Sequence, residues 1–320
     1  MQVHRNIELL PPFRNAVVTI GTFDGVHTGH RQILKQLREE AANTGGESVL
    51  ITFHPHPRKV LGTGKDPVFL INTIEEKTAL LEKAGIDHLV IVPFTESFSQ
   101  LSAREYVEDF LVSKFRPHTV VIGYDHHFGK GRQGNYRLLE EYSAAGAFSL
   151  REIPAHLLHQ STVSSTSIRK ALLEGRIEEA NELLGYDFFF EGKVVEGNKI
   201  GRQLGYPTAN LELASNEKLI PGNGIYAVTA QLIDDSKQSE QGINYSPMLK
   251  GMMSIGIRPT IGVSNRTIEV NIFDFNDQIY GSCLRVYVKK FMRPELKFDG
   301  LEALKAKIHE DEQQARKLLG

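Results

Sequence analysis

Between residues 15 and 153, short runs of β-branched and apolar residues alternate with longer segments of helical character. This alternation predicts an α/β domain, in which a parallel sheet is covered by helices on both faces. Ligands of such domains bind beyond the carboxyl ends of the strands. The expected strands are AVVTI (16–20), SVLITF (48–53), HLVIVP (88–93), TVVIG (119–123) and AFSLREI (147–153), and the expected helices are 30–42, 73–84, 103–114 and 135–144.

The pattern changes after a further helical stretch at 167–185. Strand-like segments then follow one another, which indicates a mostly antiparallel barrel. We therefore place a boundary near residue 184 and expect domains 1–184 and 185–320. The expected strands are 188–195, 224–233, 250–257, 267–275 and 282–291, with a solvated hairpin loop at 234–247. The final segment predicts a helix laid against the barrel, with apolar residues Leu301, Leu304, Ile308, Ala315 and Leu318.

Length and composition fit this division. A chain of 320 residues is long for one domain and suits two. The net charge of -2 provides no field that would hold a nucleic acid or an anionic membrane, so neither partner is expected and bound phosphates need local sites. Cys283 is the single cysteine, and no apolar run approaches the length of a membrane span or a signal peptide. We expect a soluble, cytoplasmic protein.

The segment VVTIGTFDGVHTGHRQIL (17–34) places three glycines between the first strand and the first helix. Glycines there let backbone N–H groups approach a phosphate, to which the helix dipole adds. His27 and His30 can both face that phosphate and stabilise nucleotidyl transfer. An isolated HxxH pair is more often a pair of surface side chains, a helix cap or occasionally a metal site. The prediction of phosphate binding therefore depends on the whole string. The predicted nucleotide-binding residues of this string are Gly21, Phe23, Asp24, Gly25 and Gly29.

A second motif, VSSTSIRKAL (163–172), follows the fifth expected strand. Its hydroxyls can cap a helix and donate hydrogen bonds, and Arg169 offers a planar charge. A plain Ser/Thr N-cap explains the motif equally simply. Its position at the end of the alternating region favours nucleotide binding by Ser164, Ser165, Thr166 and Arg169.

Two loops narrow the substrate: ITFHPHPRKV (51–60) after the second strand and VIGYDHHFGKGRQG (121–134) after the fourth. With them, the order of motifs resembles the N-terminal module of bacterial bifunctional riboflavin kinase/FAD synthetases, which belong to the HxGH nucleotidyltransferase superfamily. The resemblance implies a Rossmann-like sheet and contacts of His27 and His30 with ATP phosphates. It implies flavin contacts for Asp125, Phe128 and Tyr106.

This loop departs from the family pattern at His126 and His127, where an aromatic residue followed by a basic one is common. The change affects the details of the expected FMN contact. A histidine pair could instead bind a metal, but no cysteine or suitably spaced third ligand accompanies it.

The second half contains the basic, glycine-rich string EGNKIGRQLGYPTAN (196–210). It lacks the GK[ST] of a P-loop, and its glycines alone would favour a series of turns. Thr208 and Asn210, two apart in an extended segment, can present oxygen ligands to Mg²⁺. The loop is suited to lie over ATP phosphates, with contacts from Gly197, Lys199, Gly201 and Arg202.

In RTIEVNIFDF (266–275), Glu269 faces away from the apolar stripe of its strand, where a general base would be well placed. Ordinary solvation is the simpler explanation for one glutamate. However, the motifs from GRQLGYPTAN to YGSCLRVYVKKF resemble the riboflavin kinase module, a six-stranded barrel with a C-terminal helix. The resemblance implies that Thr208 and Asn210 hold Mg²⁺ and ATP and that Glu269 deprotonates the ribityl 5′-hydroxyl. Ser254 and Phe273 depart from the pattern and could reshape the flavin pocket.

We therefore predict an enzyme that phosphorylates riboflavin to FMN in its C-terminal domain and adenylylates FMN to FAD in its N-terminal one. ATP is the co-substrate and Mg²⁺ the cofactor. Two alternatives are a different HxGH nucleotidyltransferase with an unrelated β-domain, and a flavin-binding regulator with degenerate sites. The sequence predicts neither an oligomeric state nor transfer of FMN between the sites.

Overall fold

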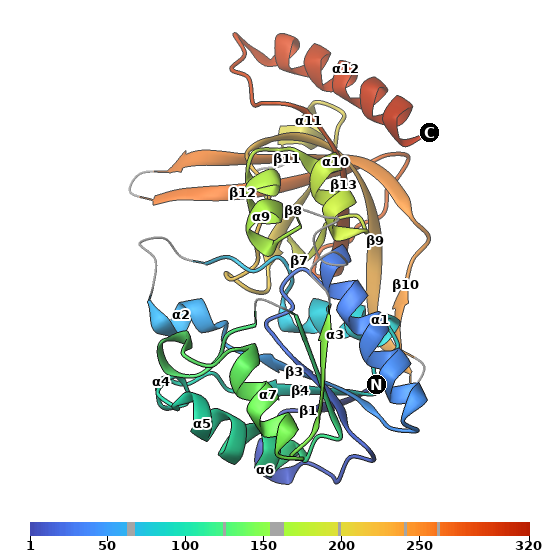
Figure 1. Ribbon diagram of the computed structural model, residues 1–320. Helices are drawn as coiled ribbons and strands as arrows, with labels where there is room; N and C mark the ends of the chain where they lie inside the picture. The colour runs from blue at the N-terminus through green and yellow to red at the C-terminus, as the bar shows by residue number, and fades with distance from the viewer. Residues whose placement is uncertain (63–67, 124–125, 154–162, 198–199, 240–241, 261–262) are drawn as a thin grey trace. The chain divides into compact units, whose positions relative to one another are not determined.

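A computed structural model describes the chain apart from residues 63–67, 124–125, 154–162, 198–199, 240–241 and 261–262 (Figure 1). The chain divides into two compact units, Met1–Ser165 and Thr166–Gly320. The first combines a sheet with helices, and the second consists mostly of strands. The boundary that we place near residue 184 stays a prediction.

The N-terminal unit contains a six-stranded sheet in the order β1-β4-β3-β2-β5-β6, and every neighbouring pair is parallel. The predicted parallel sheet is confirmed. Its first strand lies outside the five expected ones because the segment QVH is too short to show a pattern. The strands are β1 (Gln2–His4), β2 (Val17–Ile20), β3 (Ser48–Phe53), β4 (His88–Val92), β5 (Thr119–Gly123) and β6 (Ser149–Ile153).

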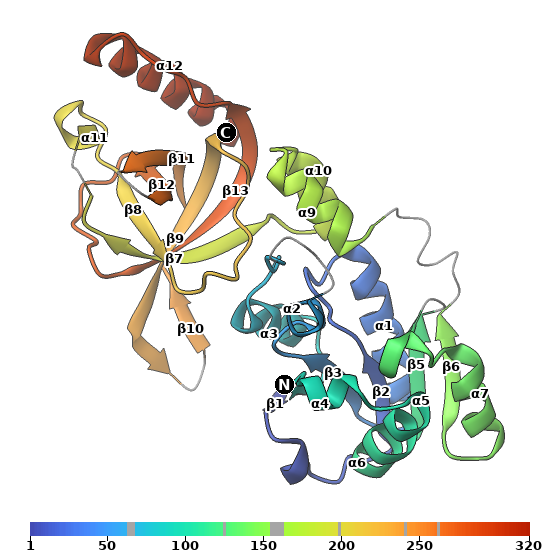
Figure 2. The ribbon, with the colours of Figure 1, turned by 90° about the vertical axis from the view of Figure 1, so that its left-hand side faces the viewer.

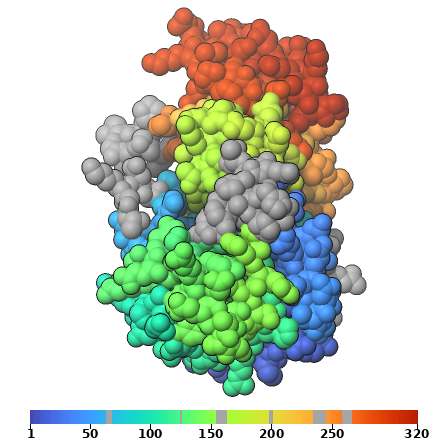
Figure 3. All heavy atoms as spheres, in the orientation of Figure 1, coloured from blue at the N-terminus to red at the C-terminus, as the bar shows by residue number. Residues whose placement is uncertain are grey.

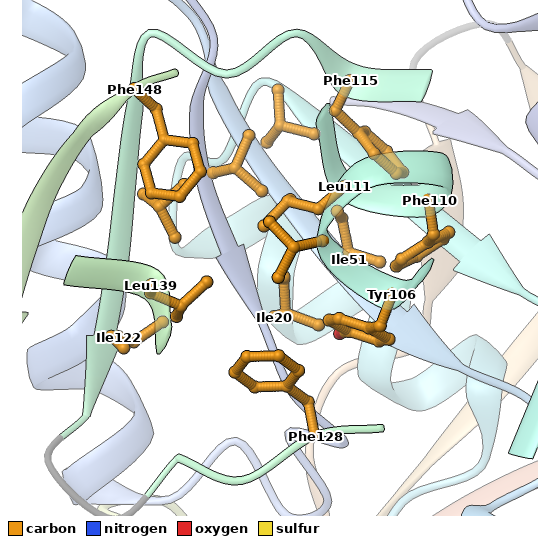
Figure 4. Close-up of a cluster of buried hydrophobic side chains, with 14 of the residues drawn as sticks. Ile20, Ile51, Tyr106, Phe110, Leu111, Phe115, Ile122, Phe128, Leu139 and Phe148 are labelled. Atoms are coloured by element: carbon orange, nitrogen blue, oxygen red, sulfur yellow. The ribbon is translucent and has the colours of Figure 1, made fainter. Parts of the chain in front are cut away.

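Helices cover both faces of this sheet, because successive strand residues point to opposite sides and both sides are apolar. One face packs against α1 and α3. The other face packs against α7 and the helical segment 103–115, whose centre is π-helical (Figure 4). The helices are η1 (Ile7–Leu9), α1 (Thr28–Asn43), α2 (Pro57–Leu61), α3 (Ile74–Lys83), α4 (Glu96–Ser99), α5 (Ala103–Glu105), η2 (Tyr106–Val112), α6 (Ser113–Phe115), η3 (Lys130–Arg132) and α7 (Tyr136–Ala144).

The helical stretch expected at 167–185 is two helices, α9 (Ser165–Leu173) and α10 (Ile177–Leu184). The break falls at Gly175, whose φ of 74° lies in the left-handed region that ends helices. The stretch is helical as predicted, and Gly175 divides it into two helices.

The C-terminal unit is a closed antiparallel barrel, as predicted. Its sheet runs β10-β9-β11-β12-β8-β7-β13, and the pairing of β9 with β13 joins six strands into a ring (Figure 2). The loop expected at 234–247 is partly strand, because β9 continues beyond the barrel and pairs with β10. The elements are β7 (Phe189–Val195), α11 (Ile200–Gln203), β8 (Ala209–Leu213), β9 (Gly224–Ser239), β10 (Gly242–Tyr245), β11 (Leu249–Thr260), β12 (Val263–Ile272), β13 (Cys283–Arg293) and α12 (Leu301–Leu319).

The last helix, α12, lies on the outside of the barrel (Figure 3). Ala315 is buried against Met252 and Phe273, whereas Leu301 and Leu318 are exposed, so only part of the predicted apolar stripe packs. None of the helices in the described part of the chain is both long and apolar enough to cross a membrane.

Candidate active sites

The first candidate site lies where the strand order of the parallel sheet reverses. From β2 the chain proceeds to β3 and β4 on one side, while β5 and β6 lie on the other. Loops that leave neighbouring strands at such a point diverge and leave room for a ligand. The predicted nucleotide turn, 21–30, leaves β2 there, and the predicted flavin loop leaves β5.

The turn after β2 is tightly folded. Phe23 and Val26 have φ values of 45° and 38°, which L side chains rarely adopt. At Gly21, a Cβ atom would lie 3.0 Å from the Phe23 ring, so a larger residue would press against that ring. The backbone thus reaches α1 within a few residues of the strand.

His27 and His30 are brought together at the start of α1. His27 is the N-cap residue, and its Nδ1 accepts a hydrogen bond of 3.3 Å from the His30 backbone N–H. The two rings stack with centroids 3.6 Å apart. A Cβ at Gly29 would lie 3.3 Å from the His27 ring, which explains the small residue between the histidines.

Burial keeps both imidazoles neutral near pH 7. It lowers the pKa of His27 to about 4, although the charge of Asp24 opposes the shift. The pKa of His30 is also lowered, first by burial and then by His27 and Lys77. The Nδ1 of His30 is buried without a hydrogen-bond partner in the described part of the chain. It is therefore an available polar atom at the helix N-terminus.

Asp24 stabilises the turn after β2 from its buried side. Its carboxylate is 1% exposed and accepts hydrogen bonds from the backbone N–H groups of Ile71, at 3.0 Å, and Asn72, at 3.3 Å. The Ser165 hydroxyl donates to the Asp24 carbonyl at 2.9 Å. These contacts brace the turn from behind.

Lys77 was missed in the sequence. Its Nζ donates to the Thr22 carbonyl at 2.7 Å, inside the same turn. The available signal was its spacing, because Ile74 and Leu81 on the same helix face are core residues. A lysine on the apolar face of an amphipathic helix indicates a buried charge.

Tyr106 and Phe128, predicted to contact flavin, stack with ring centroids 4.9 Å apart (Figure 4). They are 4% and 6% exposed and belong to the core of this face. Phe128 forms an isolated bridge with Gly134, where a Cβ would overlap the Phe128 ring.

Fewer structural details are described for the remaining residues that the sequence predicted for this site. Asp125 lies outside the described residues, as does Lys199 of the second site. The helix expected at the second motif begins at Ser165, directly after Ser164. Thr166 and Arg169 lie on it, in the C-terminal unit.

The second candidate site assembles Thr208, Asn210 and Glu269. Glu269 on β12 is directly opposite Asn210 on β8, so their side chains leave the same face of the barrel. The Thr208 hydroxyl donates to the Glu269 carboxylate at 3.3 Å. The structure therefore brings together the predicted metal ligands and the predicted base from separate motifs.

Two glycines of the predicted phosphate loop lie close to these residues or to the segment that precedes them. At Gly197 a Cβ would be 2.2 Å from the Asn210 side-chain nitrogen, and at Gly201 it would be 2.4 Å from the Tyr206 carbonyl. A side chain at position 201 would therefore meet backbone, whereas a side chain at position 197 would displace the side chain of Asn210.

Two cavities of the C-terminal unit share Thr208. One, of about 380 Å³, is also lined by Arg202 and the segment 275–280. The other, of about 340 Å³, is lined by Glu269, Ser254 and apolar side chains of the barrel and α12. Ser254 is paired with Glu269 across β11 and β12. This departure from the family pattern therefore lies in the second cavity.

Two further groups support this cavity and were missed in the sequence. Asn271 donates to the Pro207 carbonyl at 2.7 Å and so fixes the turn before Thr208. Arg293 and the buried Asp311 form a bidentate ion pair that fastens α12 to the end of β13. No local pattern indicates which charges pair across more than a dozen residues.

Family models match both units. The model for FAD synthetase matches residues 11–167, and the model for riboflavin kinase matches residues 184–319. Together with an α/β sheet and a closed barrel, these matches define a two-domain enzyme of flavin nucleotide synthesis.

Curated relatives extend over nearly the whole chain. A bifunctional riboflavin kinase/FMN adenylyltransferase from Listeria monocytogenes is 37% identical over 94% of this chain and 92% of its own length. The protein of that name from Escherichia coli K12 is 34% identical over 97% of this chain and 94% of its own length. The chain belongs to the family of bifunctional riboflavin kinase/FMN adenylyltransferases. It phosphorylates riboflavin in the C-terminal half and adenylylates FMN in the N-terminal half, with ATP as co-substrate.

A solved structure from Streptococcus pneumoniae, described as a macrolide-efflux protein, has a TM-score of 0.84 and 29% identity, and the match covers 98% of each chain. The term macrolide efflux belongs to the description of that solved structure. The family models and curated relatives assign this chain to flavin synthesis.

Proposed function

We propose that ATP for the adenylyl transfer binds at the turn between β2 and α1, with its phosphates on His27 and His30. The stacked rings lie at a helix N-terminus, where phosphate is favoured. Because both imidazoles are neutral near pH 7, each has one N–H that can stabilise charge developing on the phosphate oxygens. Asp24 supports the turn. Further nucleotide contacts are proposed for Gly21, Phe23, Gly25, Gly29, Ser164, Ser165, Thr166 and Arg169.

The FMN of this reaction is proposed to bind beside Phe128 and Tyr106. Their stacked and almost fully buried rings are aromatic side chains of the kind that line ligand pockets. Phe128 follows β5, the neighbour of β2, which brings this aromatic pair to the carboxyl edge of the same part of the sheet. Asp125 and the histidines at 126 and 127 belong to the same loop.

In the C-terminal unit, we place the nucleotide in the 380 Å³ cavity, beside Arg202, and riboflavin in the 340 Å³ cavity, beside Glu269. Further loop contacts to the nucleotide are proposed for Gly197, Lys199 and Gly201. Thr208 borders both cavities, as a residue at the point of phosphoryl transfer should.

Thr208 and Asn210 fit a Mg²⁺ site because they offer oxygen atoms next to a carboxylate, at the start of a strand that is paired on both sides. Bound Mg²⁺ would neutralise charge on the ATP phosphates. The protein side chains would hold the phosphates and the ribityl chain in line.

Glu269 is proposed as the general base of the kinase reaction. It accepts the proton of the riboflavin 5′-hydroxyl while that oxygen bonds to the γ-phosphorus of ATP and the bond to ADP breaks. In the other unit, a phosphate oxygen of FMN bonds to the α-phosphorus of ATP and pyrophosphate leaves. The observation that carries this assignment is the contact of Thr208 with Glu269.

The test uses the purified full chain with riboflavin, ATP and Mg²⁺, and separates flavins by chromatography. Glu269→Ala is expected to stop FMN formation but to convert supplied FMN to FAD, whereas His30→Ala is expected to accumulate FMN. Loss of both reactions in either folded variant would contradict two independent sites. The cytoplasmic location and the absence of nucleic-acid partners, expected from composition, stay predictions.

A further inference from the structure

Lys77 is a buried lysine that no motif includes. It lies on α3, and its side chain is 5% exposed. Burying an ammonium group is unfavourable unless nearby groups compensate its charge. Its position behind the turn that we propose to bind ATP therefore suggests a purpose beyond packing.

The contacts of Lys77 leave part of its hydrogen-bonding capacity unused. The ammonium has three N–H donors, and in the described part of the chain its one hydrogen-bond acceptor is the Thr22 carbonyl, 2.7 Å away. The Thr52 hydroxyl donates to the same carbonyl at 3.1 Å. Thr22 is thus fixed from two sides, next to the positive-φ residue Phe23.

The charge of Lys77 acts on His30, whose ring stacks on His27. The titratable groups that interact with Lys77 are Asp24 in the turn and His30 at the start of α1. Burial lowers the pKa of Lys77 to about 8, while Asp24 opposes this shift. Below that pH the ammonium is charged, and its charge disfavours a second positive charge on His30.

We propose that Lys77 is a positioning residue for adenylyl transfer, whose buried ammonium holds the Thr22 carbonyl and places a fixed positive charge near His30. The inference rests on the proposed binding of ATP at this turn. The charge attracts the triphosphate and adds to the effect of burial, which keeps His30 a neutral donor. Because the ammonium is fixed by the fold, it needs no rearrangement when ATP binds.

The test compares Lys77→Met, which removes the charge, with Lys77→Arg, which keeps it, in the full chain. For Lys77→Met we expect the KM for ATP in FMN adenylylation to rise about tenfold or more, since hydrogen bonds and contacts to charged groups contribute this much. The KM for FMN should change little, and Lys77→Arg should restore most of the ATP dependence. Riboflavin phosphorylation by the same preparation is the control for the C-terminal unit, and the unchanged KM for FMN is the control for folding of the unit that holds Lys77.

A second readout follows His30 directly. An NMR titration of the histidine ring signals should show a higher His30 pKa in Lys77→Met than in the wild type, and no such rise in Lys77→Arg. Lys77→Gln, a second uncharged variant, serves if Lys77→Met does not fold, with the same expected results.

An unchanged KM for ATP together with an unchanged His30 pKa in an uncharged variant would overturn the inference. The inference would also be overturned if Lys77→Met and Lys77→Arg lost the same fraction of FMN adenylylation activity and if that loss matched the loss of stability in each variant. His30→Ala, measured in parallel, distinguishes the role of Lys77 from the proposed binding of ATP at this turn. If His30→Ala loses ATP use and Lys77→Met does not, only the role of Lys77 fails; if neither does, the proposed ATP site fails.

Discussion

The Thr208 hydroxyl, directly before β8, donates a hydrogen bond of 3.3 Å to the carboxylate of Glu269 on the neighbouring strand β12. This contact links two motifs that are about sixty residues apart in sequence. It places an oxygen ligand suited to a cation beside a carboxylate suited to accept a proton. A phosphoryl transfer to a hydroxyl group requires both.

Glu269→Gln should lower the rate of FMN formation by about 10²-fold or more, because an amide keeps the shape of the side chain but cannot accept the proton. The measurement is FMN production from riboflavin at saturating ATP. Conversion of supplied FMN to FAD should be unchanged. Glu212→Gln, an exposed position on β8, is the matched control. A Glu269→Gln variant with full kinase activity would exclude Glu269 as the base.

Gly197→Ala should impair the kinase reaction through Asn210, because the new methyl group would lie 2.2 Å from the Asn210 side-chain nitrogen. The KM for ATP in FMN formation is expected to rise. In an Asn210→Ala background the same substitution should add little, because the smaller side chain leaves room for the methyl group. Additive losses in the double variant would show that Gly197 acts independently of Asn210.

Asp24→Ala should destabilise the N-terminal unit by about 2–3 kcal/mol, because the buried N–H groups of Ile71 and Asn72 lose an acceptor. Amide hydrogen exchange measures this local destabilisation, and the Ile71 and Asn72 amides should lose protection against exchange. Asp109→Ala, at an exposed position of the same unit, should leave them unchanged. Unaltered exchange in Asp24→Ala would mean that the carboxylate does not brace the turn.

Stability should fall when the pH decreases from about 6.5 to about 4, in part through His27. Its folded-state pKa of about 4 lies below the ordinary 6.5, so the unfolded chain binds a proton first and is favoured as pH falls through this window. The expected loss between pH 7 and pH 5 is about 2 kcal/mol for this group. His27→Asn keeps a capping acceptor but cannot titrate.

The measurement for His27 is denaturant unfolding at pH 7 and pH 5. His27→Asn should lose about 2 kcal/mol less than the wild type over this interval. An identical pH dependence in the two proteins would mean that His27 titrates with an ordinary pKa in the folded state.

Local patterns were sufficient to predict both architectures and most of the proposed catalytic groups. Strand and helix periodicity predicted the parallel sheet, and strand-like segments without helices between them, together with the family resemblance, predicted the barrel. Motif strings identified His27, His30, Thr208, Asn210 and Glu269, because chemistry at a phosphate needs specific residue types at short spacings. These patterns involve only residues that are close together in the sequence, so they can be recognised without knowledge of the fold.

The tertiary structure decided what depends on distant partners. Sequence periodicity does not specify that β1 joins the sheet edge, that Gly175 ends a helix, or that Lys77 meets Thr22. Asn271 and Asp311 likewise gain their roles from contacts that only folding creates. The sequence therefore determined the chemistry available to this protein, whereas the packing of remote segments determined which buried groups support it. The physical reason is that the burial and pairing of a charge depend on the surrounding fold.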